Sequence, residues 1–185
     1  PKLLVLLELN EFSLYHAKRS FRTLSSIPIV ACLGSVQDAE LLKHLLDEHH
    51  INTVYHAAAY KHVPLVEENP LQGLRNNSLG TQTLLEKCIE NDVSSFVLIS
   101  TDKAVRPTNV MGASKRIAEM IVQDAARCFP EHKMAIVRFG NVLDSSGSVV
   151  PLFREQIKNR QAITVTHPEI TRYFMSIGEA ARLVI

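Results

Sequence analysis

The chain has 185 residues, of which 21% are charged, and a formal net charge of +1 at pH 7. This length suits one well-buried α/β domain with a small additional lobe. The balanced charge, without any run of like charge, argues against a nucleic-acid partner. No stretch has the ~18 uncharged apolar residues of a membrane-spanning helix, and no signal peptide is visible. The three cysteines lack disulfide or metal-ligand spacing, which favours reduced thiols in a cytoplasmic compartment.

Three apolar runs predict buried strands early in the chain, at residues 1–8, 29–33 and 54–59. A helix is predicted from Asn10, a linker at 25–28, and a second helix at 39–50. Asp38 is placed to cap this second helix, whose four leucines on one face predict packing on a sheet. The histidines on or beyond its polar side are expected to be exposed, with no metal ligand among them: His44, His49 and His50.

A Gly-rich turn is missing from the start of this pattern. A dinucleotide-binding fold begins with a strand, a Gly-rich turn and a helix whose first amides contact the pyrophosphate. No G-x-x-G-x-x-G occurs anywhere in the chain. We therefore expect the first βα unit to be absent, the chain to begin at the second strand of such a fold, and its own cofactor affinity to be low.

Small residues follow the third run, where they let a ligand approach the backbone: Ala57, Ala58 and Ala59. Asn69-Pro70 then breaks the segment. Asn77 opens an amphipathic helix, in which it is expected either to support active-site backbone or water or to be an ordinary polar residue. The inward face of this helix is predicted to hold Leu84, Leu85, Cys88 and Ile89.

The most informative stretch runs from residue 100 to 115 and reads S-T-D-K-A-V-R-P-T-N-V-M-G-A-S-K. It follows the apolar run 96–99, which predicts another buried strand. It leads into a helix at 114–129, with Ile117, Met120 and Ile121 expected to face inward. In open α/β sheets, ligands bind outside the carboxyl ends of the strands. A hydroxyl, a carboxylate and an amine at such a strand end therefore indicate chemistry: Thr101, Asp102 and Lys103.

The last third predicts a strand at 134–137, a polar loop at 144–149, a helix at 150–159 and an alternating strand at 162–166. The segment R-F-G-N-V follows the first of these strands, and T-H-P-E-I-T-R-Y-F-M follows the second. Arg172 lies in the later segment, and its guanidinium suits bidentate contact with a diphosphate. A surface ion pair is the alternative interpretation. The chain then ends inside another predicted helix.

These motifs resemble the extended short-chain dehydrogenases/reductases. Thr101, position 111 and Lys115 match their Ser/Thr…Tyr-x-x-x-Lys spacing. The wording of residues 100–115 resembles the UDP-N-acetylglucosamine 4,6-dehydratases of bacterial surface-polysaccharide and glycan synthesis, and H-A-A-A-Y-K-H-V and the two later segments extend the resemblance over nearly the whole chain. Most of the superfamily has Tyr where this chain has Met111, and a thioether cannot transfer a proton. A subgroup of these dehydratases carries Met here, so the acid/base work must rest on other groups.

The resemblance implies a Rossmann-like doubly wound parallel sheet, with an NAD-binding domain at 1–150 and the start of a sugar-nucleotide-binding lobe at 151–185. Glu8 favours NAD, with NADP left open, because a carboxylate accepts from ribose hydroxyls and disfavours a 2′-phosphate; a solvated strand-end acid is the alternative. The implied cofactor contacts are Glu8, Ser35, Val36, Ala57, Ala58, Ala59, Lys61, Asn77, Ser100 and Lys115. The implied substrate contacts are Lys61, His62, Asn141, Ser148, Val149, Phe153, Thr164, Val165 and Arg172.

The resemblance also implies a reaction: oxidation at sugar C4 by NAD, loss of water across C5 and C6, and hydride return to C6. Asp102 is expected to be the acid at C6 and Lys103 the base at C5, although a tight ion pair between them would oppose both protonation states. Thr101 is expected to hydrogen-bond the C4 oxygen, and Lys115 to hold the nicotinamide ribose. Met111 leaves the C4 proton acceptor unassigned, with water relayed through Lys115 as one candidate.

Other classes of function remain open. One is a sugar-nucleotide epimerase or a dehydratase that also inverts C5, although a plain 4-epimerase has no water to eliminate and so no need of Asp102 and Lys103. Another is a non-catalytic nucleotide-binding module, which Met111 and the missing Gly-rich turn favour and the intact T-D-K triplet at 101–103 opposes. The resemblance further implies a UDP-sugar substrate and a homo-oligomer. It implies no membrane contact for this piece, and a place at the cytoplasmic face of the inner membrane if an anchor precedes it.

Overall fold

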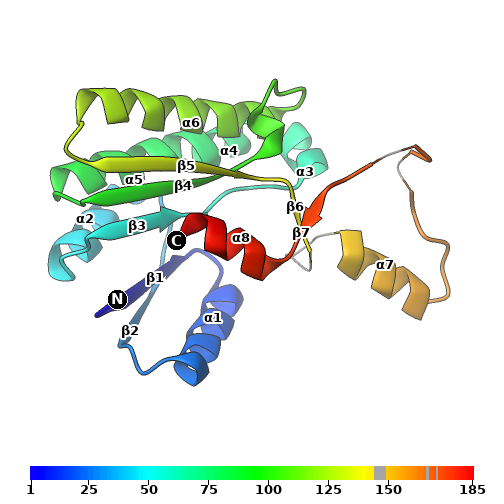
Figure 1. Ribbon diagram of the computed structural model, residues 1–185, viewed down its shortest axis with the longest axis horizontal. Coiled ribbons are helices and arrows are strands. Elements are labelled where there is room, and N and C mark those ends of the chain that lie inside the picture. The colour runs from blue at the N-terminus through cyan, green and yellow to red at the C-terminus, as the bar shows by residue number, and fades with distance from the viewer. Residues whose placement is uncertain (144–148, 166, 170) are drawn as a thin grey trace.

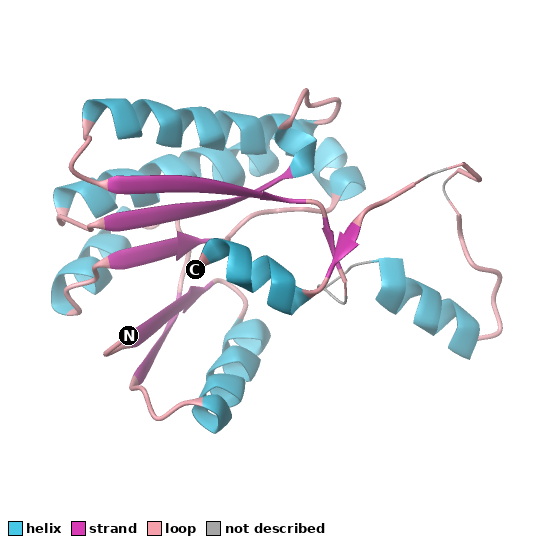
Figure 2. Ribbon diagram, viewed as in Figure 1, coloured by secondary structure: helices cyan, strands magenta, loops and turns pink. Residues whose placement is uncertain are grey.

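Parallel strands joined by helices form the body of the molecule, whose computed structural model describes residues 1–143, 149–165, 167–169 and 171–185 (Figures 1 and 2). β1 (Leu4–Glu8) pairs in parallel with β2 (Ile29–Leu33). β3 (Thr53–His56), β4 (Ser95–Thr101) and β5 (Lys133–Phe139) form a second parallel group with β4 at its centre. Parallel neighbours require a crossover, and here a helix supplies each one. The predicted α/β class with a parallel sheet is confirmed.

The first two helices begin where side chains cap them. Asn10 Oδ1 accepts a hydrogen bond from Ser13 N at 2.9 Å at the start of α1 (Glu11–Leu24). Asp38 Oδ1 accepts from Leu41 N at 3.0 Å at the start of α2 (Ala39–Glu48), which confirms the predicted cap. The predicted inner face of α2 is confirmed for three of its leucines, which are buried: Leu42, Leu45 and Leu46.

A helical run replaces the single helix predicted from Asn77. It consists of α3 (Val63–Glu68), α4 (Pro70–Leu74), the π-helical η1 (Arg75–Leu79) and α5 (Gly80–Glu90). The predicted break is confirmed between α3 and α4, but Pro70 then starts a helix, because proline suits the first helical position. The π-helical turn buries Asn76, Asn77 and Ser78, and such turns are frequent at functional sites.

The central motif forms a 3₁₀ turn and a long helix. η2 (Asp102–Ala104) follows β4, and α6 (Val110–Cys128) begins at Asn109, whose side chain accepts from Gly112 N at 2.8 Å. The predicted inward position of Ile121 is confirmed, because it packs against the core, but those of Ile117 and Met120 are wrong, because these side chains are 41% and 55% exposed. Besides Met111 and Val122, the buried face carries small and polar side chains, which let α6 approach β4 and η1 closely: Ser114, Lys115, Ala118 and Glu119.

The hydrophobic core lies between the strands and the helices α2, α5 and α6. Phe96 and Leu98 of β4 are almost completely buried against Leu85 of α5 and Val122 of α6. Burying such side chains contributes about 1.5–3 kcal/mol each. The predicted inner face of α5 is confirmed by Leu84, Leu85 and Cys88, and Ile89 packs against the same cluster. This core holds the end of β4 rigidly in place.

The last part of the chain adds a small parallel pair and two helices. β6 (Asn141–Val142) pairs with β7 (Phe174–Met175); in the sequence, α7 (Val149–Lys158) lies between these two strands and α8 (Ile177–Val184) follows β7. The strand predicted at 162–166 is wrong over its described residues, 162–165. These described residues pair with no neighbouring strand. Instead, Gln156 Nε2 donates to Thr164 Oγ1 at 2.7 Å, and Thr164 N donates to Gln156 Oε1 at 3.2 Å.

β1 and β3 are each paired on one side only in the described chain, and no backbone pairing joins the two groups of strands. α8 lies in contact with β5. None of the helices in the described ranges combines the length and the apolarity required to cross a bilayer.

Candidate active site

A cavity of about 540 Å³ opens at the carboxyl ends of β3, β4 and β5, the place where open α/β sheets bind ligands. Its wall includes most of the predicted site residues, drawn from distant parts of the sequence. They are Ala57, Ala59, Lys61, His62, Ser100, Thr101, Lys103, Met111, Lys115, Asn141, Val149, Phe153, Thr164, Val165 and Arg172. The fold therefore brings the predicted cofactor and substrate residues to one cavity.

Several predicted residues lie elsewhere. Glu8 accepts from Asn10 N at 2.8 Å, and Ser35 Oγ accepts from Gln37 N at 3.1 Å, so both complete local turns. Val36 is buried in the core beside α5. The cavity wall also excludes Ala58, Asn77 and Asp102, and Ser148 falls outside the described residues. The cofactor, substrate and catalytic contacts predicted for these residues stay predictions.

Lys115 is a buried amine in the cavity wall, with 4% of its surface exposed. Its Nζ donates to the Ile99 carbonyl oxygen at 2.7 Å. Burial lowers the pKa of Lys115 to about 8, with the negative charge of Glu119 acting in the opposite direction. Met111 lies one helical turn earlier and is also 4% exposed. The site therefore pairs a side chain that cannot carry a proton with an amine that titrates near neutrality.

Glu119 is a fully buried carboxylate on the same helix. It accepts from Ser100 Oγ at 2.7 Å, from Arg138 Nε and Nη2 at 2.8 and 2.6 Å, and from Arg116 Nη1 at 2.9 Å. Burial alone would raise its pKa, but these hydrogen bonds outweigh burial and lower the pKa of Glu119 to about 2. This ionised group ties β4, β5 and α6 together next to the cavity. The sequence analysis did not find it.

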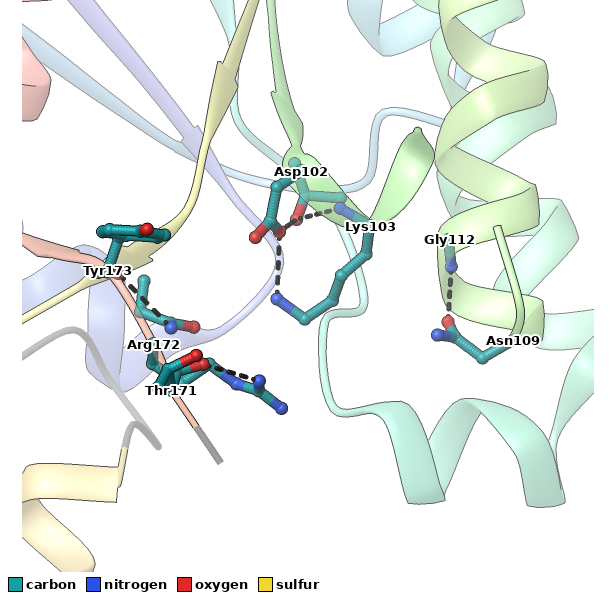
Figure 3. Close-up of polar contacts among 9 residues, drawn as sticks. Asp102, Lys103, Asn109, Gly112, Thr171, Arg172 and Tyr173 are labelled. Carbon is teal, nitrogen blue, oxygen red and sulfur yellow. Dashed lines mark hydrogen bonds and ion pairs between the residues drawn. The ribbon is translucent and has the colours of Figure 1, made fainter. Parts of the chain in front are cut away.

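Asp102 and Lys103 form an ion pair at the end of β4, with Lys103 Nζ 3.0 Å from Asp102 Oδ1 (Figure 3). Thr101 Oγ1 donates to the same Oδ1 at 3.0 Å. Partial burial raises the pKa of Asp102, but the hydrogen bonds from Lys103 and Thr101 and the lysine charge lower it overall. The resting charges are therefore a carboxylate and an ammonium, opposite to the acid and base states expected from the sequence.

Asn77 lies behind the cavity wall and holds the loop that lines it. Its Nδ2 donates to the Tyr60 carbonyl at 2.9 Å and to Ser114 Oγ at 3.0 Å, and its Oδ1 accepts from Tyr60 N at 2.7 Å. Tyr60 lines the cavity, as do Phe139, Gly140 and Phe174, which the sequence analysis also missed. The sequence did contain a signal for these residues, because Tyr60 lies in H-A-A-A-Y-K-H-V and the others lie in the two later motifs.

The opposite wall comes from the last segment of the chain. Arg172 lines the cavity, and its Nη1 donates to the Thr171 carbonyl at 3.0 Å. Asn141 Nδ2 lies 3.5 Å from the Tyr173 carbonyl, so β6 and this segment stay close together. Among the described residues, no three His, Cys, Asp or Glu side chains gather in a group that suits a metal.

The fold and the cavity define a Rossmann-like domain of the kind found in extended short-chain dehydrogenases/reductases. The whole chain, residues 1–185, matches the family described as "Polysaccharide biosynthesis protein", and the chain belongs to that family.

Two curated relatives show how this family connects to neighbouring enzymes. The chain is 49% identical over 187 residues to the capsular polysaccharide biosynthesis protein CapD of Staphylococcus aureus, covering 100% of the chain and 31% of CapD. It is 42% identical over 139 residues to a UDP-glucose 4-epimerase of Rickettsia canadensis, covering 74% of the chain and 41% of that enzyme. The chain thus spans less than half of either relative.

Solved structures give the same picture of the fold. Pen from Bacillus thuringiensis has a TM-score of 0.92 and 33% identity, over 100% of this chain and 56% of Pen. A double mutant of DesIV, a dTDP-glucose 4,6-dehydratase from Streptomyces venezuelae with NAD and DAU bound, has a TM-score of 0.88 and 18% identity, over 99% of this chain and 61% of that one. At 18% identity, the likeness to DesIV concerns the fold alone.

Proposed function

We propose that the protein carrying this chain dehydrates UDP-N-acetylglucosamine to a UDP-4-keto-6-deoxy-N-acetylhexosamine, using NAD, in the synthesis of a bacterial surface polysaccharide or glycan. The observation that carries this proposal is the cavity in which Thr101, Lys103 and Lys115 meet the second-lobe residue Arg172. Proton-transferring groups thus lie beside a group suited to a diphosphate.

The residues at the end of β3 fit a nicotinamide cofactor on one wall of the cavity. Ala57 and Ala59 present small side chains there, so a flat ring can approach the backbone closely. When bound, NAD would take the C4 hydride and later return it to C6. Ser100 and Lys115 complete this wall, and Lys115 would hold the nicotinamide ribose, as the family resemblance implies.

We assign the C4 proton to Lys115, directly or through one water. An amine accepts a proton only when neutral, and the pKa of Lys115, about 8, gives it a substantial neutral fraction near pH 8. The neighbouring His56 does not compete, because burial, with a smaller effect from Lys115, lowers its pKa to about 3. Thr101 would then hydrogen-bond the C4 oxygen, and Asp102 and Lys103 would serve the elimination across C5 and C6.

The substrate would be held from both lobes. Arg172 presents a guanidinium to the diphosphate, and Asn141 lies beside it at the start of β6. Phe153, Thr164 and Val165 would border the nucleoside, and Lys61 and His62 line the same cavity. An Arg172→Lys variant is expected to raise KM more than it lowers kcat, since the planar fork is lost while the charge stays.

A second candidate is a sugar-nucleotide 4-epimerase, which the 42% identity to the Rickettsia canadensis enzyme favours. Product mass separates the two. The protein is incubated with UDP-N-acetylglucosamine and NAD, and a product lighter by one water supports the dehydratase. An isomer of unchanged mass would establish the epimerase instead, and tight nucleotide binding without turnover would leave a binding module. Lys103→Met is expected to lose activity, while Lys43→Met, at an exposed position on α2, serves as the matched control.

A further inference from the structure

We propose that Asp102 and Lys103 act with the charges they already have: the Asp102 carboxylate removes the C5 proton, and the Lys103 ammonium protonates the departing C6 hydroxyl. This inference rests on the dehydratase function proposed above and reverses the roles that the sequence suggested. It follows from how the two side chains are bound to one another and to Thr101.

The ion pair occupies only one oxygen of the carboxylate. Lys103 Nζ and Thr101 Oγ1 both lie 3.0 Å from Asp102 Oδ1. Within the described part of the chain, no side chain donates a hydrogen bond to Oδ2. A Cβ placed on Gly140 would lie 3.9 Å from Oδ2, and Gly140 itself lines the cavity. Oδ2 therefore lies next to a residue of the cavity wall, and we take it as the oxygen available to a substrate.

Lys103 meets the requirements of an acid. It lines the cavity directly, and its ammonium has two hydrogens left after the bond to Asp102. Its backbone is also fixed, since Lys103 N donates to Thr101 Oγ1 at 3.3 Å and its carbonyl packs against Gly112 at the start of α6. The ammonium can therefore be presented to a leaving oxygen without moving the chain.

If Lys103 were the base and Asp102 the acid, a proton would first have to move from Lys103 to Asp102. With reference pKa values of ~10.4 for lysine and ~3.9 for aspartate, the ion pair is populated about 10⁶-fold or more over the pair of a neutral lysine and a protonated aspartate. Hydrogen bonds to the charged carboxylate widen this gap, and the pKa of Asp102 is indeed lowered overall by those from Lys103 and Thr101, despite the burial that raises it. The pair as it stands needs no such transfer.

The step balances in protons and electrons. Asp102 takes the C5 proton, the electrons of the C5–H bond form the C5–C6 double bond, and the C6–O bond breaks. The hydroxyl leaves with a proton from Lys103, as water. Asp102 is now protonated and Lys103 neutral. The Asp102 proton exchanges with solvent, and Asp102 then protonates C5 when hydride reaches C6; the proton released earlier from the C4 hydroxyl restores the ammonium, so the pair ends as it began.

A substrate whose leaving group needs no acid distinguishes the two assignments. In 6-deoxy-6-fluoro-UDP-N-acetylglucosamine, fluoride departs without protonation. Isosteric variants of the full protein, Lys103→Met and Asp102→Asn, are compared on both substrates, with water loss followed by product mass and fluoride release by electrode. Reduction of NAD by each variant is measured alongside, because it shows that the site still folds and still oxidises C4.

Our assignment predicts that Lys103→Met slows water loss about 10²–10⁴-fold but releases fluoride within about 10-fold of the wild-type rate. Asp102→Asn is expected to be slow on both substrates, since C5 deprotonation is needed for either. The reverse pattern, with fluoride rescuing Asp102→Asn and not Lys103→Met, would overturn the proposal. A wild-type protein that reduces NAD but releases neither water nor fluoride would instead refute the dehydratase function, and this inference with it.

Discussion

Lys115 holds its charge at a site where burial makes that charge costly. Its pKa is about 8 in the folded protein, against 10.5 for the free side chain. Between these values the unfolded chain binds a proton that the folded protein does not, so the free energy of unfolding rises with pH across this window. Below pH 8 the cost of the buried charge is fully present, and it amounts to about 3 kcal/mol.

Replacing this amine should therefore stabilise the fold while abolishing activity. Lys115→Met is expected to raise the free energy of unfolding near pH 7 by about 1–2 kcal/mol, since the Ile99 carbonyl loses its partner and offsets part of the gain. The rise in stability between pH 8 and 10.5 should disappear in the variant. Urea unfolding across this pH range measures both effects, and a Lys115→Met protein less stable than wild type at neutral pH would contradict the account.

The same titration should appear in catalysis. If Lys115 accepts the C4 proton, kcat for C4 oxidation should rise with pH through about 8 and then level off, because only the neutral amine accepts. The neighbouring charges are those of Glu119, which stays ionised, and His56, which stays neutral, so neither adds a second step in this range. NAD reduction in single-turnover measurements reports this step, and a flat profile from pH 7 to 9 would exclude Lys115 as the acceptor.

At the scale of elements, Gly112 is what allows α6 to begin against the end of η2. A Cβ there would lie 2.3 Å from the Lys103 carbonyl oxygen and 3.2 Å from Pro107 Cβ. Gly112→Ala is expected to cost about 1–3 kcal/mol despite the better helix propensity of alanine, and to lower kcat by displacing Lys103.

Gly178 in the first turn of α8 is the matched control, because the nearest atom to its Cβ is 4.0 Å away. Gly178→Ala should be neutral or stabilising by up to about 1 kcal/mol, with kcat unchanged. Thermal unfolding and steady-state kinetics of the two variants make the comparison. Equal stability and equal kcat in both would show that the close approach at Gly112 does not matter.

Glu119 ties three elements together and should govern stability in acid. Its pKa is about 2 in the folded protein, against 4.5 for the free side chain, because the hydrogen bonds outweigh the burial that opposes them. The stabilisation is present above pH 4.5 and is lost as the pH falls toward 2, by about 3 kcal/mol.

Glu119→Gln should therefore cost about 3–5 kcal/mol at neutral pH, by leaving two arginines without their carboxylate, and should unfold with a weaker dependence on acid. Glu86→Gln, on the exposed side of α5, is the control and should change stability by less than about 0.5 kcal/mol. Guanidinium unfolding between pH 2 and 7 would decide this, and similar losses in both variants would contradict the role of the buried network.

Elements were predictable from the sequence where local side chains determine them. The strand runs and the Asp38 cap needed only neighbouring residues, and both were confirmed. The strand at 162–166 failed because alternation alone supplies no partner strand, and Thr164 bonds to Gln156 instead. The prediction that Ile117 and Met120 face inward failed because apolar periodicity marks the largest side chains, whereas α6 packs mainly through smaller and polar ones. The π-helical turn had no local signal.

At the scale of the whole molecule, the motifs predicted which residues gather but not how they are charged. Lys103 and Arg172 could be placed at one site because each lies in a motif that the family resemblance covers, and both line the cavity. Whether Lys115 and Glu119 are buried depends on which face of α6 packs against the protein. The prediction from large apolar residues placed that face wrongly at Ile117 and Met120. The absence of the first βα unit stays a prediction.

The most direct test is the fate of the hydrogen at sugar C5. The protein is incubated with UDP-N-acetylglucosamine and NAD in deuterated water, and the product is examined by mass spectrometry and NMR. The account predicts a 4-keto product that has lost one water and carries deuterium from the solvent at C5. A product of unchanged composition with no deuterium on carbon, or intact substrate beside bound NAD, would contradict it.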